Sequence, residues 1–400
     1  MNITIITSVL PYPLNSGGAQ AQFNMIDMLR NEHNITLLFI ETRSNQRKVL
    51  KELSLIWPNV RIISYSYLRQ LRNFVFAKDK IARAMQMVFM KNRDKFEIKR
   101  AITPYGIYFT NDFVNFICRH IETSKSDIVQ VEFYPCLHIV NYLPEKVKKL
   151  FIHHEIRFIR NERFLRQFRL TDKETAKKEA MKKQEIDDLN KYDSIVTLTS
   201  IDKDILVRNN VSVPIYVSPA AVKTIIRPYE KCNGNVVFVG GYGHLPNKEG
   251  IDWFINEVIP KMSIKVSLQI IGSGWPLSYE SSNVKLLGFV DHLDEAICGS
   301  IMIVPILTGS GMRMKILEAA AMGVPFVTTS VGVEGLDFLN GDSCLIADGA
   351  DAFAHALECL INDNCLCEKL ARKASNVYMG KYSVEALSAV RNDIYYNIAD

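Results

Sequence analysis

Short runs of β-branched and other apolar residues recur along the chain, separated by stretches with helical periodicity. Such runs are typical of strands in parallel sheets, which helices cover on both faces. The expected strands are 3–7, 35–40, 128–132, 150–152, 195–198, 215–217, 236–240, 266–271, 284–287, 301–304, 325–328 and 344–346.

One polar stretch without periodicity, 222–235, interrupts this pattern and contains Pro228 and Gly234. Proline and glycine favour a break between domains there, and 400 residues leave room for a core on either side. We therefore expect an α/β protein of two doubly wound, Rossmann-like domains, the first ending at residue 222. Ligands of such folds bind at the carboxyl ends of the strands, here between the two domains.

The composition is that of an ordinary globular protein, with 23% charged and 48% hydrophobic residues. No apolar run is long enough to span a membrane as a helix. Residues 1–13 lack a basic start and contain Pro11 and Pro13, so we expect a first strand rather than a signal peptide. The eight scattered cysteines match no zinc or redox spacing. Reduced thiols and a cytoplasmic location are the expectation.

The segment 301–329 contains the most informative group of candidate functional residues. A strand leads into the turn Gly309-Ser310-Gly311, and a helix with Arg313, Lys315 and Glu318 follows. Glycines let backbone amides approach a ligand, and a helix N-terminus favours a phosphate. A carboxylate on the same helix face could accept hydrogen bonds from a ribose diol. The pattern predicts a nucleotide-sugar site; on spacing alone, an ordinary strand-turn-helix unit with a solvated ion pair is an equal alternative.

The sequence of residues 309–327, GSGMRMKILEAAAMGVPFV, closely resembles a C-terminal signature of retaining glycosyltransferases of family 4, also called glycosyl transferases group 1. The resemblance implies the GT-B fold, with two Rossmann-like domains, 1–222 and 223–381, that face across a cleft. It also implies a last helix, 382–400, that crosses back to the first domain. It implies an enzyme that moves a sugar from a nucleotide diphosphate donor to an acceptor hydroxyl with retention and without a metal or other cofactor. Glu318 stands at the position of the family's ribose-binding glutamate.

The resemblance also implies a set of donor-binding positions. Gly17 and Gly18 follow the first strand, where the family places a glycine turn against the donor diphosphate or the acceptor. Phe289 and Val290 would bind the nucleotide base through their backbone. The remaining implied positions are Gly241, Lys248, Gly272, Gly309, Ser310, Gly311, Met312, Arg313 and Lys315. We expect Asn247 to cap the helix that follows the Gly241 loop.

Two departures from the family pattern concern this site. Many members carry an arginine after the glycine of the second domain's first strand, and here Gly241 and Tyr242 stand there, with only Lys248 further on. Charge balance then assigns the diphosphate to Arg313 and Lys315. Ser310 replaces a glutamate that commonly contacts the transferred sugar, so backbone amides of 309–312 could hold the sugar instead.

Two histidines, His153 and His154, end the strand of residues 150–152. The family has a histidine at a comparable strand end, near the transferred sugar, so one of the pair is a candidate catalytic residue together with Glu318. The sequence leaves open which of the two it is, and a surface or capping role is the alternative. Glu132, at another strand end, is a weaker candidate on the acceptor side.

The triplet Asp202-Lys203-Asp204 has the D-x-D form of some metal-dependent enzymes. Thr199 precedes Asp202 by three residues, which is the spacing of a helix cap with an acidic first turn. We expect a cap and no metal site.

Two segments are strongly basic: 69–100 has ten Lys/Arg against three Asp/Glu, and 157–183 has ten against four. Apolar residues lie between the charges, which suits an anionic membrane surface. We expect peripheral contact with the inner face of the membrane and a glycan or lipid-linked acceptor. A solvated amphipathic helix and nucleic-acid binding are the alternatives for the same charge, and we expect no nucleic acid.

Two other functions remain open. A nucleotide-sugar epimerase of the same architecture would also bind a donor. A non-enzymatic two-domain sugar-binding protein is usually exported, and the absence of a recognisable signal peptide in the sequence counts against it.

Overall fold

The computed structural model describes residues 1–14, 16–41, 46–66, 95, 98–99, 101–103, 109–222, 224–309 and 312–399. The chain forms two compact units, each with its own sheet. Unit 1 comprises Met1–Pro219 and Ser388–Asp400, and unit 2 comprises Ala220–Leu387. The expected divisions lay after 222 and after 381, so unit 2 takes three residues before the first division and six after the second.

The sheet of unit 1 has seven parallel strands in the order β3-β2-β1-β4-β5-β6-β7. They are β1 (Asn2–Thr7), β2 (Asn34–Glu41), β3 (Arg61–Ser66), β4 (Ile128–Glu132), β5 (Lys148–His153), β6 (Ser194–Thr197) and β7 (Ile215–Val217). The order reverses between β1 and β4, so their carboxyl ends form the topological switch point of this unit.

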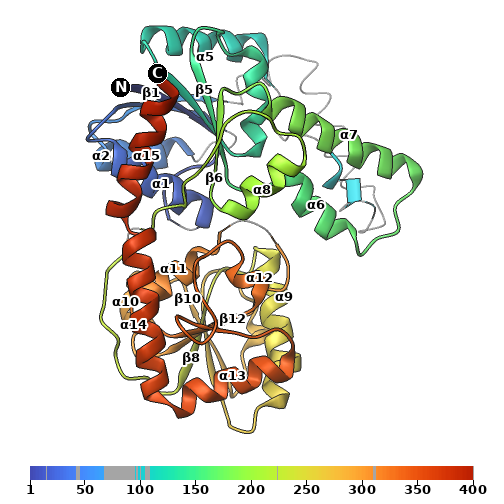
Figure 1. The fold of residues 1–400 in the computed structure, drawn as a ribbon, viewed down its shortest axis with the longest axis vertical. Coiled ribbons are helices and arrows are strands. Elements are labelled where there is room, and N and C mark those ends of the chain that lie inside the picture. The colour runs from blue at the N-terminus through green and yellow to red at the C-terminus, as the bar shows by residue number, and fades with distance from the viewer. Residues whose placement is uncertain are drawn as a thin grey trace. The chain divides into compact units, whose positions relative to one another are not determined.

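Helices cover both faces of this sheet (Figure 1). They are α1 (Gly17–Leu29), α2 (Gln46–Ile56), α5 (Asn111–Thr123), the 3-10 helix η2 (Tyr134–Tyr142), α6 (Arg157–Leu165), α7 (Asp172–Leu189), α8 (Ser200–Arg208) and α15 (Val384–Ala399). Successive strand residues point to opposite faces, and Ile5 packs with α1, α2 and α15 while Ile6 packs with α5, η2 and α6.

The end of the chain belongs to unit 1 because α15 packs on its sheet. Ile394, Tyr395 and Ile398 are buried in the same apolar cluster as α1. Polar contacts fix the helix further: Asn392 Oδ1 lies 2.7 Å from His33 Nε2, and Arg391 Nε donates to Ser218 Oγ at 3.2 Å.

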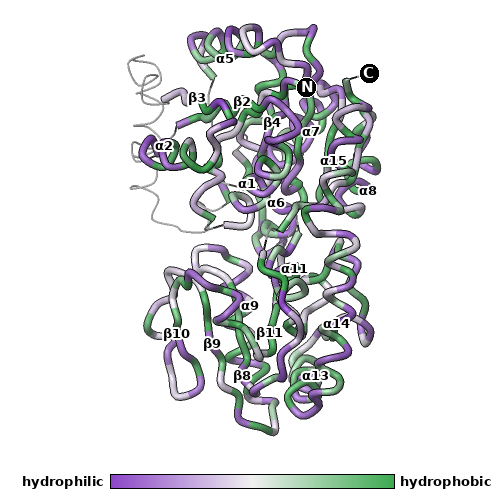
Figure 2. Tube along the Cα trace, turned by 90° about the vertical axis from the view of Figure 1, so that its left-hand side faces the viewer, coloured by the Kyte–Doolittle hydropathy of each residue, from purple (hydrophilic) through white to green (hydrophobic). Residues whose placement is uncertain are grey.

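Unit 2 has six parallel strands in the order β10-β9-β8-β11-β12-β13, and its switch point lies between β8 and β11. The strands are β8 (Asn235–Val239), β9 (Ser267–Ile271), β10 (Val284–Gly288), β11 (Ile301–Val304), β12 (Phe326–Thr328) and β13 (Leu345–Ile346). The helices are α9 (Leu245–Trp253), η3 (Phe254–Val258), η4 (Ile259–Lys261), η5 (Leu277–Tyr279), α10 (Leu293–Ala296), α11 (Met314–Ala321), α12 (Ser330–Val333), α13 (Ala350–Asn362) and α14 (Asn364–Lys381). Figure 2 shows apolar residues along β8, β9 and β11 and alternating polarity along α13 and α14.

The expected fold class, α/β with two doubly wound parallel sheets, is confirmed. Each expected strand forms within two residues of its expected bounds. Strand β3 was not expected: its sequence, RIISYS, mixes polar and apolar residues because it lies at the edge of the sheet and is only partly buried. All eight cysteines are free thiols. In the described part of the chain, no helix is long and apolar enough to cross a membrane.

Candidate functional site

Three loops at the carboxyl edge of the unit 2 sheet are joined by backbone hydrogen bonds. Gly240 N, after β8, donates to Ile271 O at 2.7 Å, and Tyr242 N donates to Ser273 O at 3.1 Å. Gly272 N, after β9, donates to Gly288 O at the end of β10 at 2.7 Å. The loops that follow β8, β9 and β10 therefore form one continuous edge beside the switch point. We call this edge, which contains residues 240–242, 272–273 and 288, the rim.

Two glycines of this rim cannot be replaced without displacing a neighbour. A Cβ on Gly240 would lie 2.5 Å from Asn247 Nδ2 and 3.0 Å from Lys315 Nζ, and its φ is +154°. A Cβ on Gly272 would lie 2.4 Å from Gly240 O, with φ at +141°. The glycines let the rim close onto the start of α11.

Lys315, in the first turn of α11, lies against this rim. Its Nζ donates to Asn247 Oδ1 at 2.8 Å and lies 4.1 Å from the centre of the Phe238 ring. Burial lowers the pKa of Lys315 from 10.5 to about 7; Glu318 opposes this change, and Arg313 adds to it. An ammonium removed from water without a full counter-charge gains most from an incoming anion.

Asn247 does not cap α9, so that expectation was wrong. The helix begins at Leu245 with His244 at the cap position, and the Asn247 side chain turns back to the rim, where Nδ2 donates to Gly241 O at 2.9 Å. Asn247 thereby joins the Gly241 loop to Lys315. Lys248, the next residue, instead pairs with Asp252 at 2.5 Å along α9.

The other expected donor residues of unit 2 fall into three groups. Arg313 occupies the cap position of α11, and Glu318 is 8% exposed one turn beyond Lys315. Phe289 is exposed after β10, next to the partly buried Val290. Gly309 (φ +117°) and Met312 flank Ser310 and Gly311, which lie outside the described residues.

In unit 1, the glycine turn lies beside an aromatic ring. Gly17 is the first residue of α1, which Ser16 caps. A Cβ on Gly18 would lie 3.0 Å from Cε1 of Phe133. Phe133 itself has φ +66°, rare for a residue with a side chain. Gly18 thus makes room for Phe133, a contact that the sequence did not reveal.

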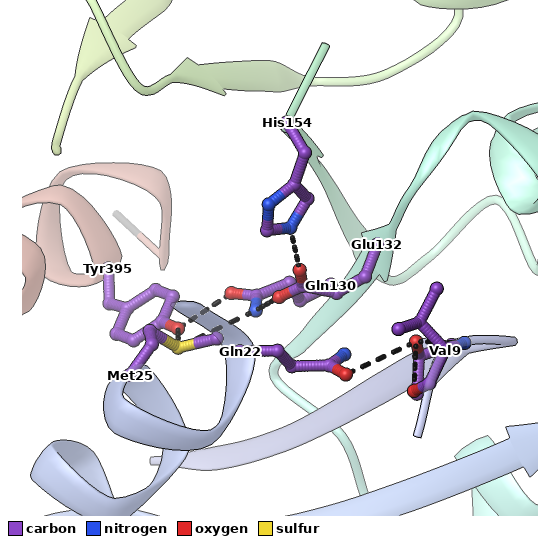
Figure 3. A network of polar contacts seen from close by, with 8 residues as sticks. Val9, Gln22, Met25, Gln130, Glu132, His154 and Tyr395 are labelled. Atoms are coloured by element: carbon purple, nitrogen blue, oxygen red, sulfur yellow. Dashed lines mark hydrogen bonds and ion pairs between the residues drawn. The ribbon is translucent and has the colours of Figure 1, made fainter. Parts of the chain in front are cut away.

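His154 lies at the carboxyl ends of β4 and β5, one strand from the switch point. Its Nε2 lies 2.5 Å from Glu132 Oε2, and its ring stacks on Phe133 at 4.0 Å between centres and 9° between planes. Its side chain is 12% exposed, whereas Glu132 is fully buried. Figure 3 shows the polar network that continues from this pair through Gln130 to Tyr395.

His153 points elsewhere. It is 2% exposed, and its Nε2 lies 3.5 Å from Glu185 Oε1 of α7. Both oxygens of Glu185 accept backbone N–H groups at the start of α6, from Arg157 and Phe158, each at 3.0 Å. His153 is therefore part of a buried cluster that caps the start of α6, whereas His154 lies at the end of a strand.

The triplet Asp202-Lys203-Asp204 is part of a helix cap, as expected. Thr199 Oγ1 accepts from Asp202 N at 3.1 Å and donates to Asp202 Oδ2 at 2.8 Å at the start of α8. Within the described ranges, no group of three His, Cys, Asp or Glu side chains could hold a metal ion.

Of the basic segment 69–100, only residues 95, 98 and 99 belong to the described residues. The other basic segment, 157–183, spans α6 and most of α7. Two apolar residues of α6 are buried, Phe158 and Leu165, each 3% exposed, and Ile159 and Phe164 are partly buried. Two arginines pair with acids: Arg160 of α6 with Glu155 at 2.8 Å, and Arg166, which follows α6, with Glu162 at 3.7 Å.

Solved structures share this fold over nearly the whole chain. Sucrose-phosphate synthase from Thermosynechococcus elongatus matches with a TM-score of 0.69 at 13% identity, covering 99% of this chain and 98% of that one. TarM from S. aureus, in a complex with fondaparinux, alpha-GlcNAc-glycerol and UDP, matches at 0.68 and 12% identity, covering 99% and 100%. Anabaena HepE in complex with UDP-glucose matches at 0.67 and 12% identity, covering 99% of each chain. Each unit is a parallel α/β domain of the kind found in the GT-B fold.

The match to a family model lies within unit 2. Residues 233–363 match the family model of glycosyl transferases group 1, so the resemblance found in the signature is confirmed over this segment. An uncharacterized 44.6 kDa protein in cps region of Klebsiella pneumoniae is 30% identical over 138 residues. The aligned part covers 30% of this chain and 36% of the length of that protein.

Proposed function

We propose that this protein is a glycosyltransferase that moves a sugar from a nucleoside-diphosphate donor to an acceptor hydroxyl. The observation that carries the proposal is Lys315, whose desolvated amine lies at the glycine rim of unit 2, within a segment that matches glycosyl transferases group 1. A diphosphate is the ligand that such a cation and the adjacent start of α11 would bind.

In this proposal, the donor residues act together. Lys315 and Arg313 meet the diphosphate, Glu318 accepts hydrogen bonds from the ribose, and the backbone of Phe289 and Val290 meets the base. UDP is the first nucleotide to test, because the solved structures of HepE and TarM were determined with UDP.

On the side of unit 1, His154 would contact the transferred sugar. Its surroundings support this choice over His153, because His154 lies at a strand end near the switch point and retains exposed area. Retention of the anomeric configuration would follow if the acceptor hydroxyl attacks the sugar from the face that the phosphate leaves. The resemblance of residues 309–327 to retaining glycosyltransferases supports this proposal. Proton NMR of the product decides this, since the anomeric coupling constant identifies the configuration.

A thermal-shift screen with UDP, GDP, ADP and dTDP tests donor binding, because a ligand that binds only the folded state raises its melting temperature. The sugar donors of the stabilising nucleotide are then incubated with the protein, with and without a mixture of glycan acceptors. A new glycoside that forms only with acceptor supports the transferase. Conversion of the sugar nucleotide without acceptor would instead identify an epimerase. Binding of free sugars but of no nucleotide would identify a sugar-binding protein.

Peripheral membrane contact is a second, separate proposal. Because Phe158 and Leu165 are buried, contact through α6 and α7 would be electrostatic rather than by insertion. Eight free thiols favour a reducing compartment, so the surface would be the inner face of the membrane. Sedimentation with anionic liposomes should fall with salt and with Arg160, Arg163, Arg166 and Arg169 changed to Gln. Equal sedimentation with neutral and anionic liposomes would exclude the electrostatic contact.

A further inference from the structure

An unbroken chain of buried hydrogen bonds in unit 1 connects His154 to the C-terminal helix. Tyr395 OH lies 2.6 Å from Gln130 Oε1, Gln130 Nε2 lies 2.5 Å from Glu132 Oε1, and Glu132 Oε2 lies 2.5 Å from His154 Nε2. Three segments far apart in the sequence supply these residues: β4, the end of β5, and α15 (Figure 3). We name His154, Glu132, Gln130 and Tyr395 the relay.

The direction of each bond follows from the groups that take part. Burial raises the pKa of Tyr395, so its hydroxyl keeps its proton and donates to Gln130 Oε1. This bond orients the amide so that its NH₂ group donates to Glu132. As a carboxylate, Glu132 accepts at both oxygens, so its Oε2 accepts a hydrogen bond from His154 Nε2–H. In the neutral ring, the relay therefore selects the tautomer with the hydrogen on Nε2 and leaves Nδ1 as an acceptor.

The ring of His154 is also held from one face. Phe133 stacks on it at 4.0 Å, nearly parallel, and adopts φ +66° to do so. This conformation is unfavourable for a non-glycine residue and persists only where its surroundings enforce it. Gly18 provides the space, since a Cβ there would lie 3.0 Å from the ring. Stacking fixes the plane of the imidazole, and the relay fixes its rotation within that plane.

Burying these groups is costly unless every partner is present. Glu132 and Gln130 are 0% exposed, and Tyr395 is 1% exposed. An apolar core would serve stability as well, and a buried hydrogen-bonded network instead specifies one arrangement. We infer that Gln130 and Tyr395 are positioning residues, which act through Glu132 to hold His154 in one tautomer and one orientation for sugar transfer. The inference rests on the proposed function of His154.

The tautomer of His154 can be measured without any substrate. In protein labelled with ¹⁵N-histidine, the signal absent from His154→Asn identifies this ring among the eight histidines. At a pH where the ring is neutral, wild type should show the Nε2–H tautomer. Tyr395→Phe removes the first donor and Gln130→Met removes the amide, so both should shift the His154 signal toward a mixture. Tyr192→Phe is the matched control: this buried hydroxyl donates to Leu137 O at 2.6 Å in the same unit, outside the relay.

Kinetics supply the second measurement. Tyr395→Phe and Tyr192→Phe should lower the melting temperature by similar amounts, because each loses one buried hydrogen bond. Only Tyr395→Phe should lower kcat, by about tenfold, with the donor KM unchanged. Gln130→Met should behave like Tyr395→Phe; if it fails to fold, Tyr395→Phe decides alone.

The outcomes separate the inference from the proposed function. An unchanged His154 signal in folded Tyr395→Phe would overturn the relay, whatever the wild-type activity. An equal loss of kcat in Tyr192→Phe would show that lower stability causes the loss of kcat, and would overturn the positioning role. A shifted signal in a protein that transfers no sugar would refute the proposed function while supporting the relay.

Discussion

Nucleoside-diphosphate binding should weaken as the pH rises above 7, because Lys315 must gain a proton to meet the diphosphate. Burial lowers the pKa of Lys315 from 10.5 to about 7. At 1.36 kcal/mol per pH unit, the ammonium form is disfavoured by ~5 kcal/mol, an upper bound because part of the side chain stays exposed. A bound diphosphate supplies the opposite charge and raises this pKa again.

The direction of the pH dependence follows from the pKa of Lys315 in the free protein and its higher pKa in the complex. Between about pH 7, the pKa of the free protein, and the higher pKa of the complex, the complex holds more protons than the free protein. Binding therefore takes up a proton in this window. Affinity is fully present below pH 7 and falls about tenfold for each pH unit above it, so Kd should rise roughly 50-fold from pH 7 to pH 9.

Isothermal titration calorimetry measures this effect directly. The stabilising nucleotide is titrated at pH 7, 8 and 9 in two buffers with different heats of ionisation, which gives the number of protons taken up. Lys315→Arg should bind with little dependence on pH in this range, because arginine stays protonated. Lys373→Met, which removes an exposed lysine of α14, should keep the wild-type dependence. Equal wild-type affinity at pH 7 and 9 without proton uptake would refute the reasoning.

Three further predictions concern single residues. Gly240→Ala should weaken nucleotide binding at least tenfold and lower the melting temperature by about 5 °C, because its Cβ displaces the Lys315 contact; Gly243→Ala, with no atom within 4 Å of its Cβ, should change neither. Glu318→Ala should raise the donor KM about tenfold and spare the fold, and unchanged kinetics would exclude the ribose contact. His154→Ala should abolish transfer and leave nucleotide binding intact, whereas His153→Ala should mainly lower stability, by about 1–3 kcal/mol in urea titrations; full activity in His154→Ala would exclude its role at the sugar.

Most of the fold could be predicted from the local pattern of apolar and polar residues in the sequence. A continuous apolar run such as Ile301–Val304 is buried on both faces, so it predicts a central parallel strand without further context. The edge strand β3 was missed, because partial burial at an edge leaves no such run. The Thr199–Asp202 cap was predictable because it depends on neighbours within a few positions.

The polar contacts of the site needed the tertiary structure. Asn247 and Lys315 are 68 positions apart, and Gln130 and Tyr395 are 265 apart, so no local rule pairs them. His153 and His154 were equivalent in the sequence, yet they face different surroundings because successive residues at a strand end point to opposite sides. Packing then determined the chemistry. Burial is the main cause that lowers the pKa of Lys315 to about 7, and the packing of α15 against the sheet brings Tyr395 to Gln130.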